Sequence, residues 1–173
     1  MREDLLWGVW ELVSFEIERV GGEPVFPYGR DAVGQIIYSP DGYMAALVGK
    51  KDRPALSSGD PASSTTDERA ALADAFLSYC GAYHVRGDTV VHEVSASFLP
   101  NWVGTSLVRR CTIEGGRLIL TTPYFVSKGT KQRAHLVWQR TGNASFDTAI
   151  DGSRSSAPRS TDTDAAPAGS QKT

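Results

Sequence analysis

Hydrophobic and polar residues alternate in short runs along most of this chain, which is the pattern of β-strands that bury one face. Turn-forming residues separate the runs at regular intervals. Ser39-Pro40-Asp41-Gly42, for example, has proline second and glycine fourth, as a type I turn prefers. The pattern predicts strands in meander order over residues 7–17, the hairpin 34–48, and residues 81–85, 89–98, 105–114, 117–126 and 133–140.

The number and spacing of these segments favour an all-β fold. About eight short strands in succession are typical of a sandwich or a barrel. A closed up-and-down antiparallel β-barrel is the better interpretation, because closure leaves no unpaired edge strand and needs only one helix.

One segment has a helical pattern instead. Thr65 and Glu68 form a capping-box signature, and Gly81 can supply a left-handed stop. Between them, apolar residues recur at helical spacing: Leu72, Ala75, Phe76 and Tyr79. We expect this helix to pack its apolar face on the sheet or across an open end of it. The polar segment before it, residues 49–64, is long for a connection inside a domain and is interpreted as a mobile flap.

The end of the chain has a different composition. Residues 142–173 are dominated by Ser, Thr, Asp, Ala, Gly and Pro, and Phe146 and Ile150 are the large apolar residues among them. Such a segment cannot bury enough apolar surface to offset the entropy lost on ordering. The sequence therefore predicts a folded domain over residues 1–141 and a disordered C-terminal tail over residues 142–173.

Composition and charge narrow the class of protein. The 173 residues suit one domain, and 40% hydrophobic with 22% charged residues is typical of globular proteins. A net charge of −2 provides no positive field for nucleic acid or an anionic membrane surface. The first residues contain no apolar run long enough for a secretion signal or a membrane span. A cytoplasmic protein is the expectation.

Cysteine and histidine give no indication of a metal site. Cys80 and Cys111 are too few and too far apart for a zinc or redox motif, so free thiols are expected. The histidines, His84, His92 and His135, are scattered and have no ligand spacing. We expect neither a metal nor another cofactor.

Several segments together resemble a known family. They are GVWELVSFE, GQIIYSPDGYMAA, YCGAYHV, HEVSASFLPNWVGTSLVRR and LVWQR, between residues 8 and 140. As a set they are similar to the bacterial and fungal lipocalin-like domain family, over residues 7–140. The resemblance implies a lipocalin-like barrel of about eight strands, whose interior can hold one small ligand. The family includes passive binders and enzymes of natural-product pathways, so function must be argued from the residues of the site.

Alternation places two strongly polar side chains inside the expected barrel. One face of the strand at 89–98 carries Val90, His92, Val94, Ala96 and Phe98. One face of the strand at 105–114 carries Leu107, Arg109, Cys111 and Ile113. His92 and Arg109 should therefore face a common lumen from neighbouring strands.

This pair suggests specific chemistry. A buried arginine needs a carboxylate, an aromatic face, or an anionic or carbonyl-bearing ligand. Histidine titrates near neutrality and could move a proton on a ligand that the arginine holds. His92 and Arg109 are thus the candidate catalytic residues. Side chains that could add hydrogen bonds and flat apolar walls are Tyr38, Tyr43, Tyr79, Tyr83, Asn101 and Trp102, and all of these except Tyr79 are taken as candidate ligand-binding residues.

Structural roles stand beside these functional ones. His92 could be a hydrogen-bonding residue of the core. Arg109 could close one end of the barrel by stacking on Trp10 through a cation–π interaction. Asn101 and Trp102 follow Pro100 in a turn, and Tyr79 would serve as packing on the helix.

Three functions remain open at this point. The first is a binding protein for a small hydrophobic molecule with a polar, carbonyl or anionic end. The second is a cofactor-free isomerase, cyclase or dehydratase that acts on a polyketide- or terpenoid-like intermediate of secondary metabolism. The third is a filled barrel that serves as an interaction module. Nucleic acid and membranes are not expected partners.

Overall fold

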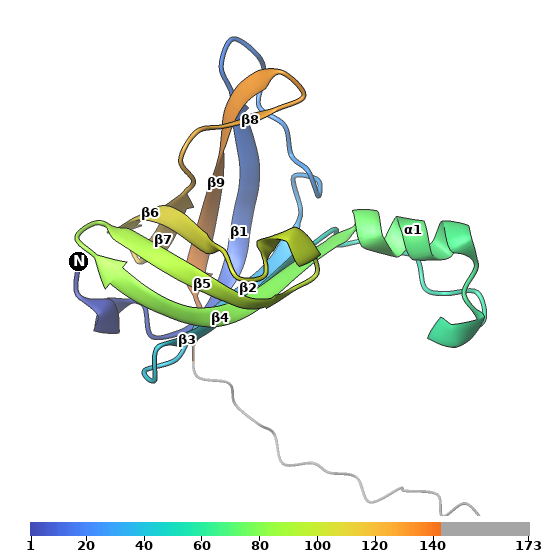
Figure 1. Ribbon diagram of the computed structural model, residues 1–173, viewed down its shortest axis with the longest axis horizontal. Coiled ribbons are helices and arrows are strands. Elements are labelled where there is room, and N and C mark those ends of the chain that lie inside the picture. Colours follow the sequence, from blue (N-terminus) through green and yellow to red (C-terminus); the bar gives the residue numbers. More distant parts are fainter. Residues whose placement is uncertain (143–173) are drawn as a thin grey trace, which may run out of the picture. The chain divides into compact units, whose positions relative to one another are not determined.

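A computed structural model describes residues 1–142 and shows a barrel closed by hydrogen bonds between its first and last long strands (Figure 1). The strands are β1 (Gly8–Arg19), β2 (Val33–Tyr38), β3 (Tyr43–Gly49), β4 (Phe76–Arg86), β5 (Thr89–Ser97), β6 (Ser106–Glu114), β7 (Arg117–Thr121), β8 (Phe125–Ser127) and β9 (Thr130–Arg140). Every pairing is antiparallel.

Strands β1 to β7 and β9 form the closed ring, while β8 pairs only with β9 and extends it as a short hairpin. The predicted all-β, up-and-down antiparallel barrel is confirmed. The strand expected over residues 117–126 is divided into β7 and β8. Apart from Gly142, the tail predicted over residues 142–173 lies outside the described residues. Its disorder and the domain boundary therefore stay predictions.

One end of the barrel is filled and capped. Large side chains with at most 1% exposure meet there: Leu6, Trp10, Ile36, Tyr38, Val90, Leu118 and Trp138. The short helix η1 (Glu3–Leu5) precedes Leu6, whose carbonyl accepts a 2.7 Å hydrogen bond from Trp10 Nε1. The Arg140 guanidinium lies 4.1 Å from the centre of the Trp10 ring and donates hydrogen bonds to the carbonyls of Leu5 and Trp7.

This cap corrects one of the sequence interpretations. The basic residue that stacks on Trp10 is Arg140, at the end of β9, and not Arg109. Trp10 and Arg140 are partners in the β1–β9 register, so the arginine follows directly from barrel closure. Arg109 is left free for another role.

Bulges shift the alternation in two strands. In β1 the register slips between Leu12 and Ser14, so that Val13 is 41% exposed while Leu12 and Phe15 both face inward. In β5 it slips where Cys80 pairs with Ala96 and Gly81 pairs with Val94. A β-carbon on Gly81 would lie 1.8 Å from the Glu93 carbonyl oxygen, so this close approach of two strands requires glycine.

The β5 bulge corrects the expected inner face of that strand. Ala96 and Phe98 are exposed rather than directed into the lumen, whereas Val90, His92 and Val94 are buried as expected. A bulge adds one residue to a strand, so the inward and outward sets exchange beyond it.

The helix is shorter than predicted and lies elsewhere. Helix α1 (Thr66–Asp74) begins with the predicted capping box: Glu68 N donates to Thr65 Oγ1 over 3.2 Å, and Thr65 N donates to the Glu68 carboxylate over 2.8 Å. It ends at Asp74, because Phe76 and the residues after it pair with β3 and β5. Gly81 is a strand residue and not the stop of the helix.

Because Phe76 and Tyr79 belong to β4, the helix keeps little of its expected apolar face. None of its residues is buried, and Figure 1 shows α1 projecting away from the strands. The expected packing of the helix on the barrel is therefore wrong. The short helix η2 (Pro61–Ser63) lies within the segment that leads to it, and η3 (Pro100–Trp102) lies between β5 and β6.

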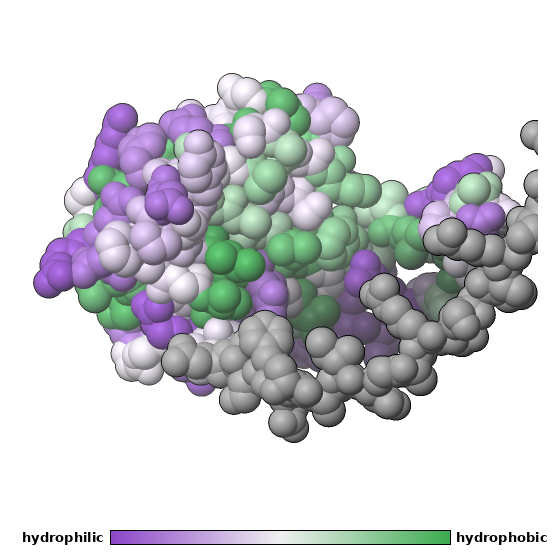
Figure 2. Space-filling model, turned by 90° about the horizontal axis from the view of Figure 1, so that it is seen from below, coloured by the Kyte–Doolittle hydropathy of each residue, from purple (hydrophilic) through white to green (hydrophobic). Residues whose placement is uncertain are grey.

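The outer face of β2 and β3 is also apolar in part. Ile36 is buried while its neighbour Ile37 is 37% exposed, and Leu47 on β3 is 38% exposed. Figure 2, which views the molecule from the side on which β3 lies in Figure 1, shows apolar side chains gathered across this face. Alternation is therefore a weak guide in these strands, because both faces carry apolar residues.

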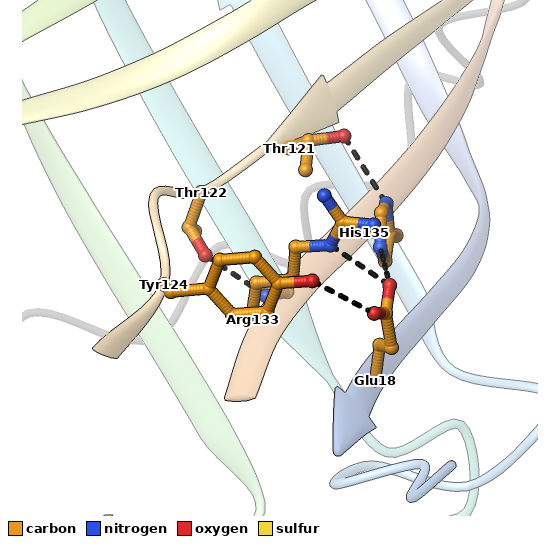
Figure 3. Close-up of polar contacts among 7 residues, drawn as sticks. Glu18, Thr121, Thr122, Tyr124, Arg133 and His135 are labelled. Carbon is orange, nitrogen blue, oxygen red and sulfur yellow. Dashed lines mark hydrogen bonds and ion pairs between the residues drawn. The ribbon is translucent and has the colours of Figure 1, made fainter. Parts of the chain in front are cut away.

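An outer polar cluster ties β1 to β9 and to the segment between β7 and β8 (Figure 3). Glu18 on β1 accepts hydrogen bonds from Arg133 (2.8 Å) and Tyr124 (3.1 Å) and lies 2.9 Å from His135 Nε2. Thr121 Oγ1 lies 3.1 Å from the other ring nitrogen of His135. The hydrogen bond with His135, followed by that with Arg133, lowers the pKa of Glu18 to about 2.

Replacing Arg140 by Ala should lower the free energy of unfolding by about 1–2 kcal/mol, because it removes the cation–π contact and the carbonyl hydrogen bonds of the cap. Urea unfolding measures this. Arg110→Ala is the matched control, since Arg110 forms only an exposed ion pair with Asp88 at 3.3 Å. Equal effects of the two substitutions would contradict a role of Arg140 in the cap.

Replacing Glu18 by Gln should reduce thermal stability near neutral pH and have a diminishing effect in acid. The pKa of Glu18 is lowered in the folded state, so its contribution is present above the unfolded value near 4.5 and is lost as the pH falls toward about 2. Melting temperatures of both proteins between pH 7 and pH 2 test this. A difference that stays constant with pH would show that the carboxylate charge is not what stabilises the cluster.

Candidate functional site

A hydrogen-bonded chain of three side chains lies inside the barrel. His92 on β5 has no exposed surface, and its Nε2 lies 2.8 Å from the Tyr38 hydroxyl on β2. Its Nδ1 lies 3.0 Å from the Tyr79 hydroxyl on β4. The two tyrosine rings are tilted against the imidazole, with centroids 5.7 and 5.8 Å away. We call these residues the Tyr38–His92–Tyr79 chain.

The apolar surroundings keep this chain uncharged. Burial, followed by the nearby positive charge of Arg109, lowers the pKa of His92 to about 3. Burial raises the pKa values of Tyr38 and Tyr79. The imidazole is therefore neutral at physiological pH, and it carries one N–H and one lone pair for its two tyrosine partners.

Arg109 faces the lumen beside this chain. It pairs with Val90 in the β5–β6 register, and His92 pairs with Leu107, so the two polar residues are diagonal neighbours on one face of the sheet. The positive charge of Arg109 lowers the pKa values of Tyr79 and Tyr38 and so partly offsets the increase that burial causes.

The guanidinium of Arg109 has little to neutralise it. Its Nη1 donates a 2.9 Å hydrogen bond to the carbonyl of Val108. Within residues 1–142, no carboxylate lies at ion-pair distance from it. A partly buried arginine without a counter-ion favours an anionic or carbonyl oxygen nearby.

The other predicted ligand-binding residues divide into two groups. Tyr83 is buried edge-on against Tyr38, with centroids 4.8 Å apart, and its hydroxyl donates to the Ser39 carbonyl over 3.0 Å. Trp102 in η3 packs edge-on against Tyr79, at 5.6 Å. These two residues support the chain from either side.

Tyr43 and Asn101 are not brought to this cluster. Asn101 is exposed in η3, and Tyr43 is 65% exposed on the outer face of β3, because its neighbour Met44 takes the inward position. Tyr43 lines a shallow outer groove of about 350 Å³. Its other lining residues are Ala82, Glu93, Val94, Ser95, Gly104 and Thr105.

Several apolar side chains on the inner face of the barrel are not fully buried. Leu12, Phe15, Tyr79 and Leu136 pack against the buried core, yet all four retain partial exposure. Phe15 also contacts Tyr28, with ring centroids 5.8 Å apart. Partly exposed apolar side chains next to a few polar groups are features of small-ligand sites.

Tyr79 is a site residue that sequence reasoning assigned to the helix. The signal was present, because Tyr79, Gly81, Tyr83 and Val85 alternate strictly and would have placed Tyr79 on the same face as Tyr83. The indole N–H of Trp138, a core residue, is also buried and has no acceptor in the described part of the chain. Nothing in the sequence pattern distinguishes it from a core tryptophan.

Comparison with known proteins agrees with this architecture. The profile of the family described as the lipocalin-like domain matches residues 7–141. The chain belongs to the lipocalin-like domain family. A curated relative, the 4'-hydroxy-3'-methoxypropiophenone carrier protein ppsC of Aspergillus oryzae, is 33% identical over 106 residues, which cover 56% of this chain and 96% of the relative.

Two further findings concern metal binding and membrane crossing in this lipocalin-like barrel. Among residues 1–142, no group of three or more His, Cys, Asp or Glu side chains is placed to hold a metal ion. No helix in that range has the length and apolar character to cross a membrane.

Replacing His92 by Gln should flatten the loss of stability in mild acid. The pKa of His92 is lowered to about 3, so its neutral form stabilises the fold above the unfolded value of 6.5, and this contribution is lost as the pH falls toward 3. The loss amounts to about 2 kcal/mol at pH 5. Urea unfolding between pH 7 and pH 5 measures it, and an unchanged slope in His92→Gln would contradict the burial of a neutral imidazole.

Proposed function

We propose that this protein binds a small, largely apolar molecule in its barrel, with a carbonyl or anionic oxygen of the ligand directed at Arg109. The observation that carries the proposal is the inward arginine without a carboxylate partner in residues 1–142, beside the Tyr38–His92–Tyr79 chain. An arginine that faces inward without a counter-ion favours a ligand with an anionic or carbonyl oxygen.

The curated relative supports an aromatic ligand. Its name describes a carrier of a propiophenone, a flat ring with a ketone on one side and a phenol on the other. Such a molecule suits the aromatic side chains of Phe15 and Tyr79, with the cationic group of Arg109 beside the Tyr38–His92–Tyr79 chain. We therefore propose aryl ketones and related phenolic compounds as the ligand class.

Binding is a better interpretation than catalysis by His92. A general base needs a free lone pair near the substrate, yet both ring nitrogens of His92 are occupied by tyrosine hydroxyls. A pKa of about 3 also makes the imidazolium a rare species at neutral pH. A cofactor-free isomerase, cyclase or dehydratase, a place in secondary metabolism and a cytoplasmic location stay predictions.

A filled barrel that acts only as an interaction module is also less favoured. Core side chains fill the capped end, but Leu12, Phe15 and Leu136 keep partial exposure although they face inward. Side chains that filled the whole lumen would bury one another instead.

Replacing Arg109 by Ala should weaken binding of 4'-hydroxy-3'-methoxypropiophenone about 10- to 100-fold, because a hydrogen bond to a charged donor is worth about 1.5–3 kcal/mol. Isothermal titration calorimetry measures the affinity. Arg110→Ala is the control, since Arg110 is the outward neighbour on β6 and pairs with Asp88.

The opposite result would assign a structural role to Arg109. If Arg109→Ala leaves the affinity unchanged and instead sharply lowers the free energy of unfolding, the arginine supports the barrel wall and the ligand lies elsewhere. If wild-type protein binds none of the propiophenone, this ligand class is wrong.

A further inference from the structure

We infer that the Tyr38–His92–Tyr79 chain has a fixed direction, which makes the Tyr79 hydroxyl a hydrogen-bond donor to the ligand next to the Arg109 guanidinium. This deepens the function proposed above and rests on it for the identity of the ligand. It assigns specificity to Tyr79 and a positioning role to His92.

The direction follows from the valence of the imidazole. A neutral ring has one N–H and one lone pair, so one tyrosine must donate to it and the other must accept from it. Either Tyr38 donates to Nε2 and Nδ1–H donates to Tyr79, or Nε2–H donates to Tyr38 and Tyr79 donates to Nδ1. Both arrangements satisfy His92 equally well, because the two distances, 2.8 and 3.0 Å, are ordinary hydrogen bonds.

The burial of the two tyrosines decides between these arrangements. Tyr38 is 1% exposed, and His92 is the one hydrogen-bond partner of its hydroxyl among the described residues. If Nε2–H donated to Tyr38, the Tyr38 hydroxyl hydrogen would be buried without an acceptor. Tyr79 as a residue retains partial exposure, so the Tyr79 end of the chain is the side from which a ligand can approach. The cost of a buried unsatisfied donor favours the first arrangement about 10- to 100-fold.

In that arrangement the Tyr79 oxygen accepts from His92 and its hydrogen points away from the imidazole. Arg109 is the diagonal neighbour of His92 on the same face of the sheet, and its charge acts on the Tyr79 hydroxyl that is bonded to His92, so guanidinium and hydroxyl can serve one ligand atom together. Both groups are donors. The position therefore fits an oxygen that has lone pairs and no hydrogen, which is the oxygen of a ketone or a carboxylate.

The direction can be tested without any ligand. Nitrogen–proton correlation spectra of isotope-labelled protein at neutral pH identify which ring nitrogen of His92 carries the hydrogen. We expect the hydrogen on Nδ1, and Tyr38→Phe should weaken that preference by removing the donor to Nε2. A hydrogen found on Nε2 in the wild-type protein would overturn the inference, whatever the protein binds.

The hydrogen bond from Tyr79 to the ligand is tested with three probes that share one carbon skeleton. 4'-Hydroxy-3'-methoxypropiophenone has ketone and phenol, 3'-methoxypropiophenone lacks the phenolic hydroxyl, and 2-methoxy-4-propylphenol has a methylene in place of the ketone. Tyr79→Phe should weaken both ketones about 10-fold and leave the propylphenol unchanged. Tyr124→Phe is the matched control, because it removes a hydroxyl bonded to Glu18 on the outer face, and it should change none of the three affinities.

Other outcomes separate the two proposals. An equal loss for all three probes in Tyr79→Phe would show that Tyr79 only packs against the ligand, and a loss confined to the two phenols would show that it contacts the phenolic oxygen. Either result overturns the inference while leaving binding intact. If no probe binds the wild-type protein, the proposed function fails for this ligand class, and the tautomer of His92 then decides the direction of the chain by itself.

Discussion

Hydrogen bonding between β1 and β9 is the interaction on which the rest of the structure depends. It extends from Trp10 and Arg140 to Arg19 and Gln132 and turns a meander into a ring without edges. Closure divides every strand into an inner and an outer face, so each polar side chain on an inner face must find a partner there. It also brings Arg140 onto Trp10, which caps one end of the barrel.

Three of the inner polar side chains satisfy one another's hydrogen bonds. His92, Tyr38 and Tyr79 come from three different strands and use one another as partners, so the cost of burying them is met without a charge. Arg109 is different, because it retains its charge and lies where its field disfavours a proton on His92. The site therefore combines a neutral hydrogen-bonded chain with a cation that has no carboxylate partner in residues 1–142. This division of roles suits a protein that holds a ligand more than one that transforms it.

Alternation in the sequence could predict the barrel and the inward direction of His92 and Arg109, because hydrophobic periodicity records which face of a strand is buried. It could not locate the bulges near Val13 and in β5, since an inserted residue changes the phase without changing the composition. Phe76 and Tyr79 were misassigned for a related reason: their spacing fits a helix as well as a strand, and only pairing with β3 and β5 decides. The partner of Trp10 depends on which strand closes the ring, and no local pattern contains that information.

The path of the chain between β3 and β4 has a consequence for how this scaffold can vary. Gly49 and Phe76 are register partners, and Lys50 N donates a 3.0 Å hydrogen bond to the Ala75 carbonyl, so the chain leaves the barrel and returns at neighbouring positions. The whole excursion is an insertion into a β-hairpin, and its helix α1 contains no buried residue. Doubling the length of such a loop costs only about 0.6 kcal/mol. Evolution or an engineer can thus exchange this segment for another sequence, even a whole domain, while the barrel and its contents stay as they are.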